Sequence, residues 1–154
     1  MDNYIFRNAM GRFATGVTII TTQVEGEIHG MTANAFMSVS LDPKLITISI
    51  DHKARMLDFI KQSGQFAVSI LKDEQQDISM HFAGQKESFS SVQFDKISGV
   101  PIIKDALAAV VCDVEEYNEV GDHTLFIGRV LDIELTDGNP LAFYGGQYGS
   151  YQMV

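Results

Sequence analysis

The sequence predicts a mainly β protein in which short helices pack outside an antiparallel, closed or half-closed barrel. Segments rich in β-branched residues recur along the chain, as in residues 17–24 and 45–50. The helical patterns are short and do not alternate regularly with these strands, which argues against a doubly wound parallel sheet. With 154 residues, 45% of them hydrophobic, the chain fits one globular domain over residues 1–154.

Three short helices are expected, over residues 6–13, 56–64 and 74–83. Gly16 follows the first of these and is a suitable helix end. This first helix carries three apolar residues on one face, Phe6, Met10 and Phe13.

Six segments have the composition of strands. They cover residues 17–24, 28–41, 45–50, 66–71, 107–114 and 124–135. The second is expected to be one long, irregular strand that Asp42 and Pro43 end.

The formal net charge of −9 restricts what the protein binds. Nucleic acid and anionic membranes need a basic face, so we exclude both as main partners. An anionic small ligand is still compatible with this charge if its site gathers basic groups locally, and most basic residues lie in the first half of the chain. No run approaches 18 apolar residues and no basic and apolar leader is visible, so we expect a cytoplasmic protein without a membrane span.

Nucleophilic and metal chemistry find little support in the sequence. The single cysteine, Cys112, lies in an apolar run and is expected to be a buried structural thiol. The four histidines show no metal-ligand spacing, so no metal site is predicted.

Polar residues inside strand-like segments are the first candidates for a binding site. Asn34 is unusual in the middle of a strand. It either satisfies a bulge or turn, or it helps to direct an amide and main-chain N–H groups toward a planar polar ligand. Ser38 and Ser40, on either side of Val39, would place two hydroxyls on one face of the same strand.

Two further candidates lie in connections. Lys53 and Arg55, in the segment 51–55 before a helix, suit a phosphate, although a solvated basic loop is the plain alternative. His123 follows Gly121 and Asp122, and either belongs to an ordinary hairpin or serves as a hydrogen-bonding or acid–base group near a ligand.

Taken in order, three stretches resemble the flavin reductase family with the FMN-binding split-barrel fold. They are residues 6–18, 30–43 and 121–130, followed by Pro140, Leu141 and Tyr148. The resemblance implies a six-stranded antiparallel split β-barrel that forms a homodimer with flavin near the subunit interface. It also implies an NAD(P)H:flavin oxidoreductase that uses FMN or FAD, with NADH or NADPH as substrate, and supplies reduced flavin to a partner monooxygenase.

The resemblance further implies roles for individual residues. The flavin ring and ribityl chain would be lined by Thr32, Ala33, Asn34, Ser38, Val39 and Ser40. The phosphate would be held by the loop that contains Asp51, Lys53 and Arg55, and a loop over the flavin would contain Phe82 and Phe89. His123 would lie near the nicotinamide. The phosphate loop lacks the Ser and Thr hydroxyls of many family members, so charge and main-chain amides would bind the phosphate.

Three alternatives stay open on the sequence. A flavin protein that does not turn over NAD(P)H, such as an electron carrier or a flavin sensor, would share these residues. The other two are a small ligand-binding barrel without flavin and a pyridoxamine-phosphate-oxidase-like enzyme, since a fold does not fix a function.

Overall fold

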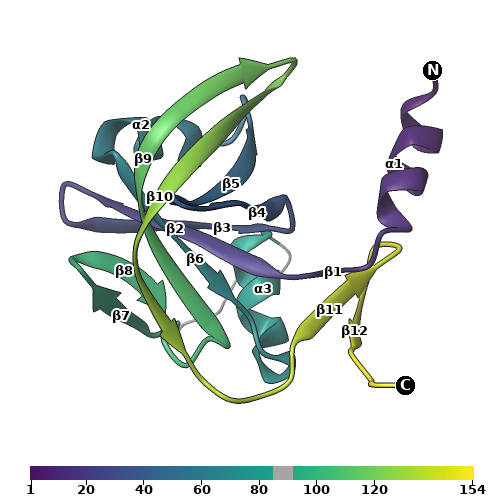
Figure 1. Cartoon of the computed structure of the whole chain (residues 1–154). Coiled ribbons are helices and arrows are strands. Elements are labelled where there is room, and N and C mark those ends of the chain that lie inside the picture. The colour runs from purple at the N-terminus through teal and green to yellow at the C-terminus, as the bar shows by residue number, and fades with distance from the viewer. Residues whose placement is uncertain (85–91) are drawn as a thin grey trace.

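The computed structural model describes residues 1–84 and 92–154, and its main feature is one antiparallel sheet of seven strands (Figure 1). All neighbouring strands in this sheet are antiparallel, which confirms the mainly β prediction. In hydrogen-bonded order the strands are β3 (Glu27–Ala33), β2 (Thr18–Val24), β6 (Gln65–Ile70), β9 (Ala108–Val120), β10 (His123–Leu135), β5 (Lys44–Asp51) and β4 (Phe36–Leu41).

Smaller elements surround this sheet. One small sheet consists of β1 (Thr15–Gly16), β11 (Leu141–Tyr144) and β12 (Gln147–Ser150), and a hairpin consists of β7 (Phe94–Ile97) and β8 (Val100–Ile103). The α-helices are α1 (Asn3–Gly11), α2 (Met56–Ser63) and α3 (Gln76–Phe82), with a 3₁₀ turn at Asp73–Gln75 before α3. Across the described residues, no helix is long and apolar enough to cross a membrane.

The expected strand over residues 28–41 consists of two strands, and this changes the architecture. β3 ends at Ala33 and β4 begins at Phe36, and Asn34 and Ala35 between them belong to neither strand. β3 and β4 then become the two edge strands of the main sheet instead of one continuous strand. The predicted six-stranded barrel is therefore wrong in its strand number, and the sheet has seven strands with two separate edges.

Alternating side chains on the strands build the core. On β5, Ile46, Ile48 and Ile50 are buried, whereas Thr47 and Ser49 lie on the opposite face and are half-buried. α2 packs against the same core through Met56, Leu57 and Ile60.

The helix ends agree only in part with the sequence patterns. α2 is followed, as predicted, by Gly64, which adopts the left-handed conformation with φ of 72°. α1 ends at Gly11, several residues before the predicted Gly16, and Gly16 itself lies in β1. β1 pairs with β11, so Gly16 belongs to a strand pairing with a distant segment and does not end the helix.

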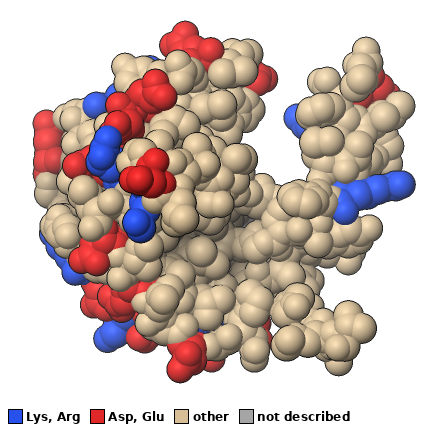
Figure 2. Space-filling view, in the orientation of Figure 1, with Lys and Arg blue, Asp and Glu red and all other residues tan. Residues whose placement is uncertain are grey.

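Helix α1 stands apart from the main sheet and buries none of its side chains (Figure 1). The carboxylate of Asp2 caps it by accepting a hydrogen bond of 2.7 Å from the N–H of Tyr4. Figure 2 shows few charged residues on the surfaces between the sheet and α1, whereas Lys, Arg, Asp and Glu gather on the other side of the sheet. Of the three residues predicted on one helix face, Phe6 and Met10 lie in α1 and are 54% and 57% exposed, whereas Phe13 lies beyond the end of the helix and is 78% exposed.

Cys112 is fully buried in the core, as predicted. Burial, together with the negative charge of the neighbouring Asp113, raises the pKa of its thiol to about 12. The thiol therefore stays protonated at neutral pH and is not a nucleophile.

Candidate functional site

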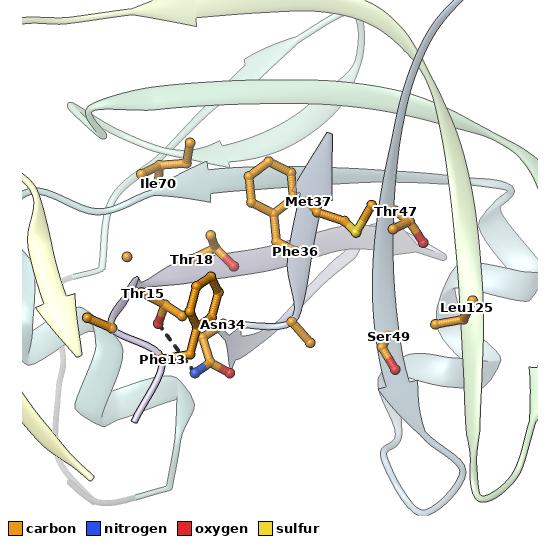
Figure 3. A pocket seen from close by; sticks show the side chains of 13 residues that line it. Phe13, Thr15, Thr18, Asn34, Phe36, Met37, Thr47, Ser49, Ile70 and Leu125 are labelled. Carbon is orange, nitrogen blue, oxygen red and sulfur yellow. Dashed lines mark hydrogen bonds between the residues drawn. The ribbon is translucent and has the colours of Figure 1, made fainter. Parts of the chain in front are cut away.

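A cavity of about 700 Å³ lies between β5 and the segment that joins α1 to β2 (Figure 3). Its apolar lining residues are Phe13, Ala14, Gly16, Ala35, Phe36, Met37, Ile70 and Leu125. Its polar lining residues are Thr15, Thr18, Asn34, Thr47 and Ser49, and none of the described lining residues is charged. A volume of this size and a largely apolar wall with a few polar groups are typical of a small-molecule site.

One wall of the cavity comes from the pairing of β5 with β10. Ser49 pairs with Leu125, and two residues further along the strands Asp51 pairs with His123. Side chains two residues apart share one face of a strand, so Asp51 and His123 continue the wall that Thr47, Ser49 and Leu125 begin. Two predicted site residues, far apart in the sequence, therefore lie together beside the cavity.

Asn34 lies in the short connection between the edge strands β3 and β4, and its side chain lines the cavity (Figure 3). The side-chain Nδ2 of Asn34 donates a hydrogen bond of 3.4 Å to Oγ1 of Thr15. The main-chain carbonyl oxygen of Asn34 accepts a hydrogen bond of 3.0 Å from the N–H of Phe36. Asn34 therefore sits where the strand breaks, as the first interpretation expects, and its side chain lines a cavity. Its role in binding a planar ligand stays a prediction.

A second cavity of about 200 Å³ is lined in part by residues 32–34. Thr32 is fixed there, because its hydroxyl donates a hydrogen bond of 2.6 Å to the carbonyl oxygen of Ser79 in α3. The hydroxyls of Ser79 and Tyr148 lie 2.7 Å apart, which ties β12 to α3. Asn34 lines both cavities. The other residues that line the second cavity are Val17, Thr32, Ala33, Ser79, Ala83, Phe143 and Tyr148.

The predicted ligands on β4 lie outside these cavities. A bulge falls between Ser38 and Ser40, which leaves Val39 as the extra residue opposite β5. Val39 is 45% exposed, and among the described residues only the preceding Phe36 and Met37 of β4 line the large cavity. The role of Ser38, Val39 and Ser40 stays a prediction.

The basic segment 51–55 forms a corner between β5 and α2. Asp51 holds its shape: its carboxylate accepts a hydrogen bond of 2.9 Å from the N–H of Lys53, and its carbonyl oxygen accepts one of 2.9 Å from the N–H of Ala54. Lys53 and Arg55 are exposed, and the guanidinium of Arg55 lies 5.8 Å from the ring centre of Phe59. The corner thus presents two cations next to the end of the cavity wall.

His123 stands at the first position of β10, beside this corner. Its Nδ1 lies 2.7 Å from Oδ1 of Asp122, and its side chain is 42% exposed. The pKa of the Asp122 carboxyl is lowered, mainly by the hydrogen bond from His123 and to a smaller extent by the charge of the imidazole.

Phe82 has a packing role in the part of the chain that the structure describes. Its ring lies against Gly30 of β3, where an added Cβ would meet it at 2.8 Å, and its ring centre is 6.3 Å from that of Phe94. Phe82 lines neither cavity. Phe89, the other residue predicted for this loop, lies outside the described residues.

Sequence reasoning missed several lining residues. Phe13 was assigned to a helix face, and Leu125 was expected only as part of a strand. Thr47 and Ser49 alternate with the buried isoleucines of β5, and this alternation is a signal that could have placed them on the opposite face of the strand. It could not show which other segment faces them.

The family model for the flavin reductase like domain matches residues 10–152. An NADH-dependent flavin reductase from Rhodococcus sp. is 45% identical over 151 residues, which cover 96% of this chain and 86% of that protein. The NADH-dependent flavin reductase StyB from Pseudomonas fluorescens is 37% identical, with 96% and 89% covered.

Solved structures agree with this match. The flavin reductase PheA2 in its native state superposes with a TM-score of 0.97 at 56% identity, over 99% of this chain and 100% of that chain. An NADH:FAD oxidoreductase from Streptomyces globisporus in complex with NAD and FAD fragments has a TM-score of 0.90 at 34% identity, over 98% and 93%. Matches that span nearly the whole of both chains establish that this chain belongs to the family with the flavin reductase like domain.

Proposed function

We propose that this protein is an NADH-dependent flavin reductase that transfers a hydride from the nicotinamide to FMN or FAD and supplies the reduced flavin to a partner monooxygenase. The observation that carries the proposal is the large uncharged cavity whose wall runs into the corner of Asp51, Lys53, Arg55 and His123. Family membership supports the same reaction. Relatives include the reductase component of a 4-hydroxyphenylacetate 3-monooxygenase from Thermus thermophilus, which supports the partner. We also propose that residues 1–154 act as one domain.

The residues present fit a flavin. Apolar side chains such as Phe36 and Leu125 suit the faces of a planar ring, and the amide of Asn34 suits its polar edge. The uncharged wall suits the ring, whereas the cations of Lys53 and Arg55 lie outside the cavity, where a phosphate tail would reach them. When bound, the flavin accepts the hydride, and the protein supplies orientation and electrostatics.

Each group of residues has a distinct task in this proposal. Phe13 and Met37 line the cavity with apolar side chains, which limit the entry of water when the flavin is bound. Asn34 and the main chain around it offer hydrogen bonds to the polar edge of the ring, where negative charge develops on reduction. His123 orients the nicotinamide carboxamide or holds a proton beside it. A protein nucleophile is not needed.

A steady-state assay with FMN, FAD and riboflavin against NADH and NADPH tests this function. We expect loss of NADH absorbance that depends on added flavin. Bound flavin without loss of NADH would instead support the alternative, an FMN-binding electron-transfer or flavin-sensing protein. A protein that neither binds flavin nor consumes NADH would overturn both readings.

The basic corner gives a prediction about phosphate. Replacing Lys53 and Arg55 together by alanine should weaken FMN about tenfold, because two charge-assisted hydrogen bonds to the phosphate are lost. Riboflavin has no phosphate and should be affected less than about twofold. Fluorescence titration with both ligands measures the difference. Lys61→Ala is the matched control, because it removes a cation of α2 that lies over the ring of Tyr117 in β9, away from the basic corner. Equal weakening of both ligands would contradict the phosphate assignment.

We propose further that the protein is a homodimer in which a second copy covers α1 and the cavity-bearing face. α1 buries no residue, and the surfaces between it and the sheet carry few charges (Figure 2). Val39 and Leu41 of β4 add exposed apolar area, 45% and 80% exposed. A contiguous apolar face of this kind is typical of an interaction surface.

Adding charge to the apolar face of α1 should therefore disrupt the dimer. Phe6→Asp combined with Met10→Asp should give a monomer in analytical ultracentrifugation, because two carboxylates would be buried at the interface without partners. Asn8→Asp adds a carboxylate on the opposite face of the helix and should leave the dimer intact. A wild-type protein that sediments as a monomer would refute the proposal.

A further inference from the structure

Asp122 connects two parts of the proposed site by separate hydrogen bonds. Its carbonyl oxygen accepts a hydrogen bond of 3.0 Å from the N–H of His52, which belongs to the basic corner. Its carboxylate oxygen Oδ1 lies 2.7 Å from Nδ1 of His123. The preceding Gly121, with φ of 61°, forms the turn that places Asp122 between β9 and β10. One residue therefore fixes both the loop beside the phosphate-binding cations and the histidine.

The Asp122 carboxylate also determines which nitrogen of His123 carries a hydrogen. The contact to His123 lowers the pKa of Asp122, so this carboxyl is ionised at neutral pH. An ionised carboxylate only accepts hydrogen bonds, and Nδ1 must then be the donor. In the neutral imidazole, Nε2 is left as an acceptor that points away from Asp122.

We propose that Asp122 is a positioning residue that holds the His123 ring as the Nδ1–H tautomer, so that Nε2 accepts a hydrogen bond from the nicotinamide carboxamide. The side chain of Asp122 is 91% exposed and lines neither cavity, so it acts through His123. His123 shares a strand face with Leu125, which lines the large cavity, so a ring held in place by Asp122 stands at the end of the cavity wall. This inference rests on the proposed role of His123 in NADH binding.

Two substitutions separate this role from a general effect of charge. Asp122→Ala removes the acceptor, and we expect kcat/KM for NADH to fall about tenfold, mainly through KM, with the dissociation constant of FMN unchanged. Asp122→Asn keeps an oxygen that accepts from Nδ1–H, and kcat/KM should recover to within about threefold of the wild type. Glu119→Ala removes another carboxylate from the same hairpin and should leave both constants unchanged.

Nitrogen NMR of the histidine side chains gives a readout that does not depend on activity. The His123 signals, assigned by their loss in His123→Gln, should show the Nδ1–H tautomer in the wild type and in Asp122→Asn. In Asp122→Ala they should move toward Nε2–H. An unchanged tautomer in Asp122→Ala, or an Asn variant as impaired as the Ala variant, would overturn the inference. If the enzyme does not turn over NADH at all, the proposed function fails, and the tautomer measurement still decides the role of Asp122.

Discussion

Replacing Gly128 by alanine should lower the free energy of unfolding by about 2–3 kcal/mol, because the site has no room for a methyl group. A Cβ at this position would lie 2.6 Å from Cζ of Phe66 and 2.8 Å and 2.9 Å from Cβ and Sγ of Cys112. Both neighbours are fully buried and belong to the main core, so neither can move into solvent. Urea unfolding followed by circular dichroism measures the loss.

The control is a glycine in a strand with open space around it. Gly149 of β12 has no heavy atom within 4 Å of the position that a Cβ would take, so Gly149→Ala should change stability by less than about 0.5 kcal/mol. Phe66→Leu removes Cζ, and the cost of Gly128→Ala should be smaller in that background. If Gly128→Ala unfolds at the same urea concentration as the wild type, the close packing of β10 on β6 and β9 is wrong.

Replacing His123 by alanine should lower kcat/KM for NADH by a factor on the order of 10 to 100, because the variant loses the group that orients the carboxamide or holds a proton beside it. The dissociation constant of FMN should change less than about threefold, since His123 stands at the end of the cavity wall and does not line the cavity. Stopped-flow reduction by NADH and flavin titration measure the two quantities separately.

His52→Ala is the matched control for His123. His52 lies in the same corner, and its Nε2 is 3.2 Å from the hydroxyl of the buried Thr124, on the inner face of β10. We expect its loss to affect turnover far less. If His123→Ala turns over NADH as the wild type does, His123 has no part in the mechanism.

The fold was predictable wherever residues near in sequence determine it. The β-branched residues at 45–50 predicted β5, and the apolar residues at 56–60 predicted α2. The break at Asn34 was not resolved, because a strand that leaves one edge of a sheet and enters at the other has the same local composition as one long strand. The apolar residues at 6, 10 and 13 predicted a helix, but they did not show that the chain leaves the helix after Gly11 and pairs with β11 from Thr15.

The sequence identified individual residues of the candidate site, but it did not show which of them line one cavity. Asn34 and His123 were noticed because their residue types are unusual in strands or follow a turn. Their neighbours Ser49 and Leu125 are ordinary strand residues, and only the long-range register of β5 and β10 brings them together. The family resemblance supplied the order of the motifs, whereas the contact between Asp122 and His52 needed the structure.

The burial of the Cys112 thiol bears on the resistance of a flavin reductase to oxidation by peroxide that its reduced flavin generates. Reduced flavin that meets oxygen before it meets its acceptor yields hydrogen peroxide, which oxidises thiolates far faster than protonated thiols. Because the only cysteine of the chain is shielded from solvent and keeps its proton, peroxide finds no reactive sulfur there. Oxidative damage should fall instead on thioethers at the surface, such as those of Met37 and Met153, which reductases of methionine sulfoxide can repair.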